Sequence, residues 1–469
     1  MRDRATLAVA LLVAALAAGV RIAPAVEYPL WQDEVASARI VVEPNIGDAL
    51  ARVERTESTP PFWYLLVWLL HRTGVPVEGG RAVSIAAGAL LAGLLVVYGR
   101  RVLPLWAAGA AGVLVALGGQ LVSRGSELRA YSLYAFLALV FAWLLERAAA
   151  RPSLGRLAVL ALSVAVGVLT HYFFALVVVA GLVWLWSAGA FRAAHGRVTA
   201  AIGLGALPFA AWAPSFWTQI ENQRFSWIGD FDLLKAAASY STFVWSAGPL
   251  YVREQVQLGA WEALARVAVL AVVVAGSIVL ARTAQRGRLA ALLATLPVVL
   301  AAVLWVLGAE VFTSRNLIAA APFAALAAGA LLAALPRPVA VAGAVATLAL
   351  AVGGFLREQD FEPPPYERVA EALEDEGWHP GDPIAISGGA HELPALGSIY
   401  GLRSPVGWYL PGHPELVLPP DEGAAACERA FHIVPEENGI AVQRLPCGPD
   451  LEQRAAEAGA ILFVPRAGD

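Results

Sequence analysis

Residues 82–98 read AVSIAAGALLAGLLVVY, a run of apolar and small residues without a charge, and Arg100 and Arg101 follow it closely. A helix needs about 20 apolar residues to cross the hydrocarbon core of a bilayer, so this run has nearly the length of a span. Ten other stretches share its character. The eleven predicted spans are 5–25, 82–98, 104–122, 129–146, 156–170, 172–188, 199–216, 262–281, 289–308, 317–335 and 338–356. The sequence therefore predicts a polytopic all-α membrane protein, with about 11 transmembrane helices and additional juxtamembrane helices.

The composition agrees with that prediction and excludes other classes of protein. Of 469 residues, 58% are hydrophobic and 15% are charged, and the mean hydropathy is +0.64. A soluble domain carries about 25% charged residues. The high apolar content excludes a disordered chain, two cysteines exclude a disulfide scaffold, and a net charge of -4 argues against a nucleic-acid binder.

The charges divide the chain into two predicted domains. In residues 1–356 the basic residues outnumber the acidic ones by 9, whereas in 357–469 the acidic residues are in excess by 13. Residues 1–356 are the predicted membrane domain, with outer loops 26–81 and 217–261, and 357–469 are a predicted small, soluble, extracytoplasmic α/β domain. Its pattern is a helix from Tyr366 to Glu376 and strands at Ile384–Ser387 and Ile461–Val464.

Arginine placement predicts the orientation of the spans. The stretch Pro61–Leu70 is apolar but too short to cross, at about 1.5 Å per residue, so we interpret it as an interfacial helix. With the N-terminus in the cytoplasm, every inner loop then holds arginine, as the positive-inside rule requires. The predicted protein is a multi-pass protein of the inner or plasma membrane whose C-terminal domain is extracytoplasmic. Cys427 and Cys447 both fall in that domain, where an oxidising exterior favours a disulfide.

Polar side chains collect near the ends of spans on the predicted outer face. Ionisable groups at membrane depth usually mark a functional cavity, although a solvated headgroup-level residue is the alternative for any one of them. The candidate site-lining residues are Asp33, Glu34, Glu127, Arg129, Tyr131, His171, Tyr172, Glu310 and Arg315. Two acidic pairs and two arginines on one side predict a site that handles both a proton and an anion.

Five segments resemble the integral-membrane C-type glycosyltransferases, in particular bacterial relatives of protein O-mannosyltransferases and lipid A aminoarabinose transferases (glycosyltransferase family 39-like). They are LWQDEVASAR at 30–39, STPPFWYLLVWLL at 58–70, SRGSELRAYSLYAF at 123–136, THYF at 170–173 and SRNLIAAAPFAAL at 314–326. Together they extend over about three quarters of the chain. One departure is visible, because Ser58 and Thr59 stand where the aminoarabinose branch has Glu-Lys before Pro-Pro.

The resemblance implies a periplasmic active site in the cell envelope. It implies transfer of a sugar, hexosyl or pentosyl, from a polyprenyl-phosphate donor held in the membrane lipid to an extracytoplasmic glycan, lipid or protein acceptor, with inversion at the anomeric carbon. Asp33 corresponds to the family's acidic residue, a general base or acceptor-orienting group, with Glu34 beside it.

Arg129 and Arg315 are the candidates for the donor phosphate, because guanidinium groups are always charged and bind phosphate bidentately. Alternatives remain open for each residue. Glu127 could pair with Arg129 or cap a span, Arg315 could extend to the interface, and Glu34 could orient a backbone amide. A divalent cation also stays open, since His171 could join Asp33 and Glu34, but the dense spacing of a metal site is absent from the sequence.

Two other functions compete with the transferase interpretation. A lipid-linked-sugar transporter or flippase would show internal repeats and broken or polar helices at mid-membrane, and the sequence shows neither pattern. A noncatalytic membrane scaffold would leave the outer-face charges unexplained.

Overall fold

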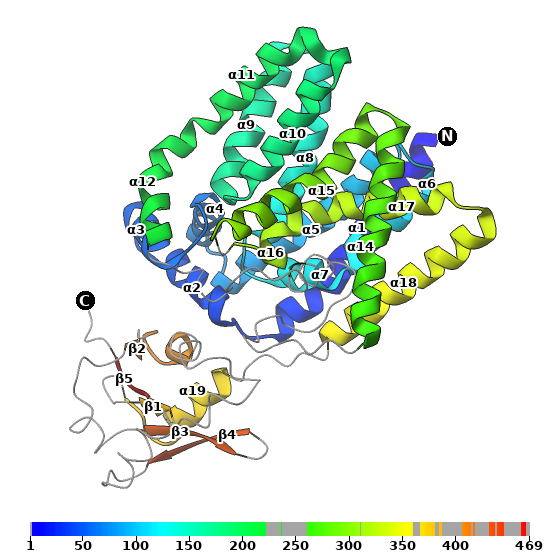
Figure 1. The fold of residues 1–469 in the computed structure, drawn as a ribbon. Helices are drawn as coiled ribbons and strands as arrows, with labels where there is room; N and C mark the ends of the chain where they lie inside the picture. The colour runs from blue at the N-terminus through cyan, green and yellow to red at the C-terminus, as the bar shows by residue number, and fades with distance from the viewer. Residues whose placement is uncertain are drawn as a thin grey trace. The chain divides into compact units, whose positions relative to one another are not determined.

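The computed structural model describes residues 2–221, 236, 260–309, 311–359, 366–379, 384–386, 406–413, 416–417, 431–436, 439–444 and 461–465. Most of them are helical (Figure 1). The first helices are α1 (Arg2–Glu27), α2 (Gln32–Val41), α3 (Ile46–Thr56), α4 (Phe62–Arg72), η1 (Val77–Gly80), α5 (Arg81–Gly99), α6 (Leu105–Leu117), α7 (Gly119–Ser126), α8 (Tyr131–Ala150) and α9 (Leu154–Thr170). The later ones are α10 (Phe174–Ser187), η2 (Gly189–Ala194), α11 (His195–Ala206), α12 (Pro208–Glu221), α14 (Ala260–Thr283), α15 (Gln285–Val306), α16 (Ser314–Leu317), η3 (Ile318–Ala320), α17 (Ala321–Ala334), α18 (Arg337–Gln359) and α19 (Tyr366–Asp375).

The chain forms two compact units. The bundle unit comprises Met1–Ala25 and Ile40–Asp360, and the C-terminal unit comprises Val26–Arg39 and Phe361–Asp469. The end of α1 and most of α2 therefore belong with the C-terminal residues, although they lie inside the predicted outer loop 26–81.

Helix covers each of the eleven predicted spans. Within the described residues, six helices are long and apolar enough to cross a membrane, or up to eight if two bent pairs each count as one span. The protein is thus a polytopic helical membrane protein, while the count of eleven spans stays a prediction.

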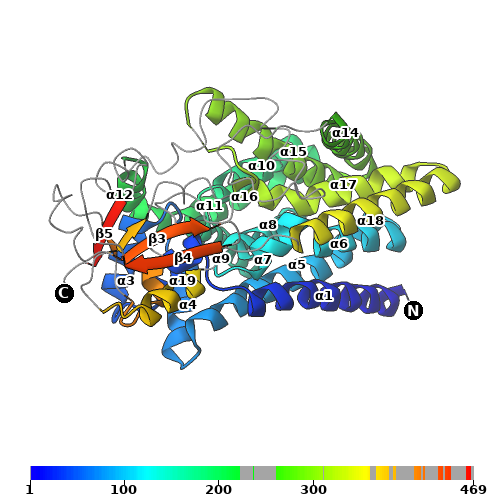
Figure 2. The same cartoon turned by 90° about the horizontal axis from the view of Figure 1, so that it is seen from below.

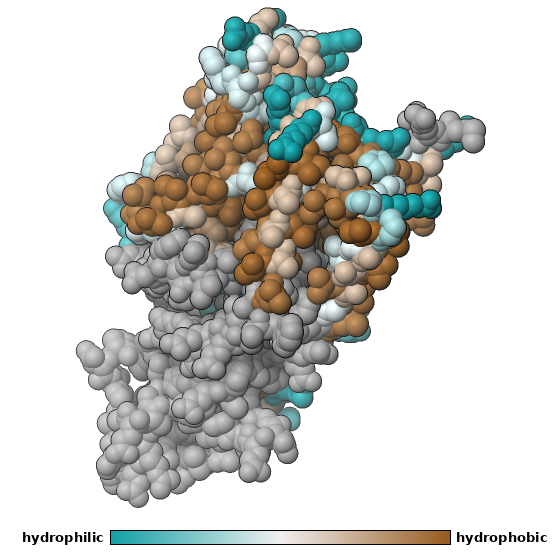
Figure 3. Space-filling model, turned by 45° about the vertical axis from the view of Figure 1, so that its right-hand side comes forward, coloured by the Kyte–Doolittle hydropathy of each residue, from teal (hydrophilic) through white to brown (hydrophobic). Residues whose placement is uncertain are grey.

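The outer surface of the bundle unit suits lipid better than water. Large aliphatic side chains stand exposed along its helices, among them Leu12, Leu162, Leu204 and Val345. Figure 3 shows one face of the molecule, where hydrophobic side chains cover much of the bundle unit and hydrophilic ones gather towards its upper end. An apolar area of that extent would be unfavourable in water and is stable against acyl chains.

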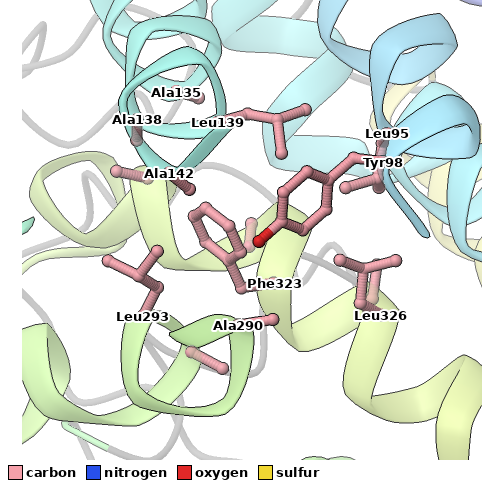
Figure 4. Close-up of a cluster of buried hydrophobic side chains, with 14 of the residues drawn as sticks. Leu95, Tyr98, Ala135, Ala138, Leu139, Ala142, Ala290, Leu293, Phe323 and Leu326 are labelled. Atoms are coloured by element: carbon pink, nitrogen blue, oxygen red, sulfur yellow. The ribbon is translucent and has the colours of Figure 1, made fainter. Parts of the chain in front are cut away.

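Small residues let the bundle helices pack closely. Helix α5 packs against α6 and α8, and α6 against α17 (Figure 2). A Cβ added at Gly276 of α14 would lie 2.0 Å from the carbonyl oxygen of Ala327 in α17, so this crossing requires glycine. In the centre, Tyr98 and Phe323 face each other among Leu95, Leu139, Ala142, Leu293 and Leu326 (Figure 4).

The predicted span 104–122 is a broken helix. Helices α6 and α7 meet at a 53° bend next to Gly118. The fully buried Arg21 of α1 donates hydrogen bonds to the carbonyl oxygens of Val115, Ala116 and Leu121, at 2.8 to 3.3 Å. A break in a membrane helix leaves carbonyl groups without their usual partners, and a guanidinium with five donors satisfies several at once.

The C-terminal unit contains α19 and five short strands. The strands are β1 (Ile384–Ile386), β2 (Leu416–Val417), β3 (Phe431–Glu436), β4 (Gly439–Arg444) and β5 (Ile461–Pro465). They form one sheet in the order β2-β5-β1-β3-β4, in which only β1 and β3 are parallel. Much of 357–469 lies outside the described residues, so an α/β domain over this whole range stays a prediction.

Candidate functional site

A buried polar cluster lies where four segments of the bundle unit meet, and we call Glu57, Tyr64, Arg129, Tyr131 and His171 the polar cluster. Glu57 ends α3, because Pro60 and Pro61 follow and cannot continue a helix. Tyr64 is on α4, Arg129 lies between α7 and α8, Tyr131 begins α8, and His171 lies in the turn between α9 and α10. None of the five side chains is exposed.

The cluster is built around an ion pair. Arg129 Nη1 donates to both carboxylate oxygens of Glu57, each at 3.0 Å, and the two side chains are 7% and 3% exposed. The Tyr64 hydroxyl donates to Glu57 Oε2 at 2.7 Å, and the Thr59 hydroxyl is 2.7 Å from that of Tyr64. A buried charge is tolerated only with such partners, so the pair fixes Arg129 between Glu57 and the rings of Tyr64 and Tyr131, each 5.9 Å away.

A second ion pair closes the end of α7. Arg124 Nη1 donates to Glu127 at 2.7 and 2.9 Å, and Arg124 also lies 5.9 Å from the Tyr131 ring. Two guanidinium groups, those of Arg124 and Arg129, therefore lie 5.9 Å from the Tyr131 ring. The structure pairs Glu127 with Arg124 and Arg129 with Glu57. A pair between Glu127 and Arg129, the alternative from the sequence, stays a prediction.

His171 is 2% exposed and its ring stacks on Tyr134, with centroids 4.3 Å apart and planes 5° from parallel. The backbone N–H of Phe173 donates to His171 Nδ1 at 3.3 Å. Among the described residues, His171 Nε2 has no hydrogen-bond partner. Burial, followed by the positive charges of Arg129 and Arg315, lowers the pKa of His171 to about 3. The imidazole is therefore neutral at physiological pH.

Arg315 is half-buried on the short helix α16, and its charge reaches His171. The Thr313 side chain caps α16 by accepting from the Asn316 N–H. The Ser314 hydroxyl donates to Gln120 of α7 at 3.3 Å, and the Tyr134 hydroxyl of α8 donates to the Asn316 carbonyl oxygen at 3.3 Å. These bonds hold α16 against α7 and α8, so the bundle unit brings Arg129, His171 and Arg315 together.

Tyr172 faces a different set of neighbours. Its hydroxyl donates to Gln219 Oε1 at 2.5 Å and accepts from Trp212 Nε1 at 2.9 Å. Gln219 in turn donates to the Val53 carbonyl oxygen of α3 at 2.9 Å. Tyr172 thus ties the turn after α9 to α12, and through it to α3.

Asp33 and Glu34 begin α2 and belong to the C-terminal unit. Glu34 is 1% exposed and accepts from the Trp31 backbone N–H at 3.3 Å, which is the amide-orienting alternative considered from the sequence. Asp33 is half-buried near Tyr366. Burial, followed by the negative charge of Asp33, raises the pKa of Tyr366. A meeting of Asp33 with Arg129 and Arg315 stays a prediction.

Residues 406–413 hold α2 within the C-terminal unit. The Leu30 backbone N–H donates to the Tyr409 hydroxyl at 2.5 Å. Arg39 Nη1 donates to the His413 carbonyl oxygen at 2.8 Å, and its guanidinium lies 5.9 Å from the Trp408 ring. The helix that contains Asp33 and Glu34 is therefore hydrogen-bonded, just before its start and near its end, to a segment about 380 residues further along the chain.

Three of the predicted site residues lie outside the described residues: Glu310, Cys427 and Cys447. Within the described part of the chain, no group of three or more His, Cys, Asp or Glu side chains is arranged to hold a metal ion. The disulfide and the divalent cation stay predictions.

Comparisons with known proteins show that this chain is similar in fold to solved structures. No family model matches the sequence, and no curated protein matches it. Among solved structures, the Archaeoglobus fulgidus oligosaccharyltransferase in complex with zinc and sulfate is similar over 79% of this chain, with a TM-score of 0.51 and 13% identity. Its apo form is similar over 80%, with a TM-score of 0.51 and 15% identity. The chain spans only 56% and 58% of those two chains. The likeness shows that this chain shares its fold with those oligosaccharyltransferase chains, and it does not select the O-mannosyltransferase or aminoarabinose branch.

Proposed function

We propose that this protein is a glycosyltransferase that uses a polyprenyl-phosphate sugar. It moves a hexosyl or pentosyl group to an extracytoplasmic glycan, lipid or protein acceptor, with inversion. The observation that carries the proposal is the set of buried Arg129, buried His171 and half-buried Arg315 in a lipid-embedded bundle of the C-type fold. Basic and hydrogen-bonding groups beside an apolar surface suit a ligand that is a phosphate at one end and a prenyl chain at the other.

The proposed reaction is a direct displacement. Asp33 accepts the proton of the acceptor's nucleophile, which forms its bond to the anomeric carbon while the bond from that carbon to the phosphate oxygen breaks. The polyprenyl phosphate leaves with the electron pair of the broken bond. Arg129 and Arg315 support the departing phosphate with their positive charges. A positioned base of this kind contributes roughly 10² to 10⁴-fold to the rate.

One observation favours a transporter of lipid-linked sugars as the second candidate. Broken helices within the membrane are typical of transporter binding sites, and α6 and α7 form such a break. However, the carbonyl groups beside the break accept from Arg21. Because these carbonyl groups already bind Arg21, the break has a structural role. The transferase remains better supported than the transporter.

Transfer in membrane fractions tests the proposal. Radiolabelled polyprenyl-phosphate hexoses and pentoses are incubated with membranes containing the wild type, Asp33→Asn, or Asp48→Asn as a matched control on an exposed helix start. Transfer by the wild type and by Asp48→Asn is expected, with a loss of at least about 10²-fold for Asp33→Asn. Equal transfer by all three removes Asp33 from the chemistry, and transport of the intact lipid-linked sugar without transfer supports the second candidate.

A further inference from the structure

Nε2 of His171 has no hydrogen-bond partner among the described residues, and its surroundings indicate the chemistry of the group that binds there. Nδ1 of His171 accepts the hydrogen bond from the Phe173 N–H, and a neutral imidazole has one acceptor nitrogen and one donor nitrogen. The hydrogen is therefore on Nε2. Among the described residues this N–H has no acceptor, although the side chain is 2% exposed. Buried donors in proteins are nearly always satisfied, so an acceptor beyond the described residues is indicated.

The charges around His171 indicate what kind of acceptor fits. Arg129 and Arg315 both act on the imidazole with positive charge. Glu57 compensates Arg129. An anionic oxygen beside His171 would accept the Nε2–H bond and lie in the field of Arg315, whereas a neutral acceptor would gain only the bond.

A metal ion is the less suitable occupant. Coordination through Nε2 needs the lone pair of that atom, which would move the proton to Nδ1. Nδ1–H and the Phe173 N–H would then be two donors pointing at each other, and the bond between them would be lost. The turn that holds His171 thus selects an anion over a cation.

We propose that His171, as a neutral Nε2–H donor, and Arg315 together bind the phosphate of a lipid phosphate monoester, which is the leaving group of the proposed transfer. This assignment rests on the proposed function. It gives the phosphate one uncharged, directional bond and one charged contact, and it makes His171 a binding residue whose role does not require protonation.

Three substitutions separate the Nε2–H bond from the packing of the ring. His171→Phe keeps a flat ring against Tyr134 and removes the donor. His171→Gln places an amide N–H close to the position of the histidine Nε2, because the two side chains reach a similar length. His195→Phe is the matched control, since His195 is also buried and its Nε2 has no partner within the described residues. His195 begins α11 and lies on the predicted cytoplasmic side.

Binding is measured with the purified full-length chain in nanodiscs of uncharged lipid. The probes are undecaprenyl phosphate, undecaprenol, phosphatidic acid and inorganic phosphate, and the thermal stability of each variant is recorded in parallel. For undecaprenyl phosphate, His171→Phe should bind roughly 10 to 100-fold more weakly than the wild type, as expected for loss of one hydrogen bond to a charged group. His171→Gln and His195→Phe should bind within about threefold of the wild type, as expected when that bond is kept or was never involved.

Several results would overturn the inference in distinguishable ways. If His171→Phe binds undecaprenyl phosphate as tightly as the wild type, or if a stably folded His171→Gln loses as much affinity as His171→Phe, the Nε2–H assignment is wrong and the proposed transfer is unaffected. Preference for phosphatidic acid or inorganic phosphate over undecaprenyl phosphate would identify a general phosphate site in place of the donor's. No phosphate binding by the wild type would remove both the inference and the proposed donor.

Discussion

The pair of Glu57 and Arg129 gives the sharpest prediction about stability. Glu57→Gln keeps the size of the side chain and a hydrogen-bonding oxygen, but it removes the negative charge that faces Arg129. The two residues are 3% and 7% exposed, so water screens their interaction little. Breaking a buried ion pair by removing one partner costs about 3 to 5 kcal/mol. We expect Glu57→Gln to reduce the free energy of unfolding by an amount in that range.

The assay is a double-mutant cycle with Glu57→Gln, Arg129→Gln and the double variant, each unfolded in mixed detergent micelles and followed by tryptophan fluorescence. The double variant should be less destabilised than the sum of the single variants, because no lone charge remains buried. Arg52 and Glu43 form the control pair, at 21% and 15% exposed, where water screens the charges more and loss of one partner should cost less than at Glu57. If Glu57→Gln costs no more than Glu43→Gln, or if the cycle gives no coupling, the interpretation of the polar cluster is wrong.

Two further predictions concern Arg21 and His171. A Cβ at Gly125 would lie 2.3 Å from Arg21 Nε, so Gly125→Ala should displace the guanidinium and lower the free energy of unfolding by about 1 to 3 kcal/mol. Gly155→Ala is the control and should not destabilise the protein, because a Cβ there has nothing within 4 Å. Equal unfolding midpoints of the two variants would contradict this prediction. Because the pKa of His171 is lowered from 6.5 to about 3, the unfolded chain takes up a proton below the first value while the folded chain does not. Stability should therefore fall by about 1.4 kcal/mol per pH unit as the pH drops from about 6.5 towards about 3, and should not change through this group above it. A wild type with the same pH slope as His171→Gln would exclude this effect.

The length of the apolar runs was enough to predict where the long bundle helices lie, because a membrane requires long apolar runs. The sequence did not predict α2 and α3, which lie in the predicted outer loop 26–81 and are not apolar runs. The apolar runs could not predict the break between α6 and α7. Residues 104–122 form one largely apolar run, and the carbonyl groups beside the bend accept from Arg21, which stands about 95 residues earlier. The signal for this break in the sequence was Arg21, an arginine within the otherwise apolar predicted span 5–25.

The sequence predicted several residues of the candidate site, but it did not predict which of them form ion pairs with each other. Arg129, Tyr131, His171 and Arg315 were recognised from their positions near span ends. The partner of Arg129 was not, because Glu57 is 72 residues away and pairing at such a distance leaves no pattern in a single sequence. The assignment of residues 26–39 to the C-terminal unit was missed for the same reason, since its contacts reach residues 406–413.

The measurement that tests the central claim most directly uses the purified full-length protein in liposomes, with a polyprenyl-phosphate sugar as the sole donor. The amounts of free polyprenyl phosphate and of glycosylated acceptor are followed over time. The account predicts that they rise together, one molecule of polyprenyl phosphate for each sugar transferred, and that the sugar's anomeric configuration is inverted. A donor that stays intact while it crosses the bilayer, or sugar transfer with retained configuration, would contradict it.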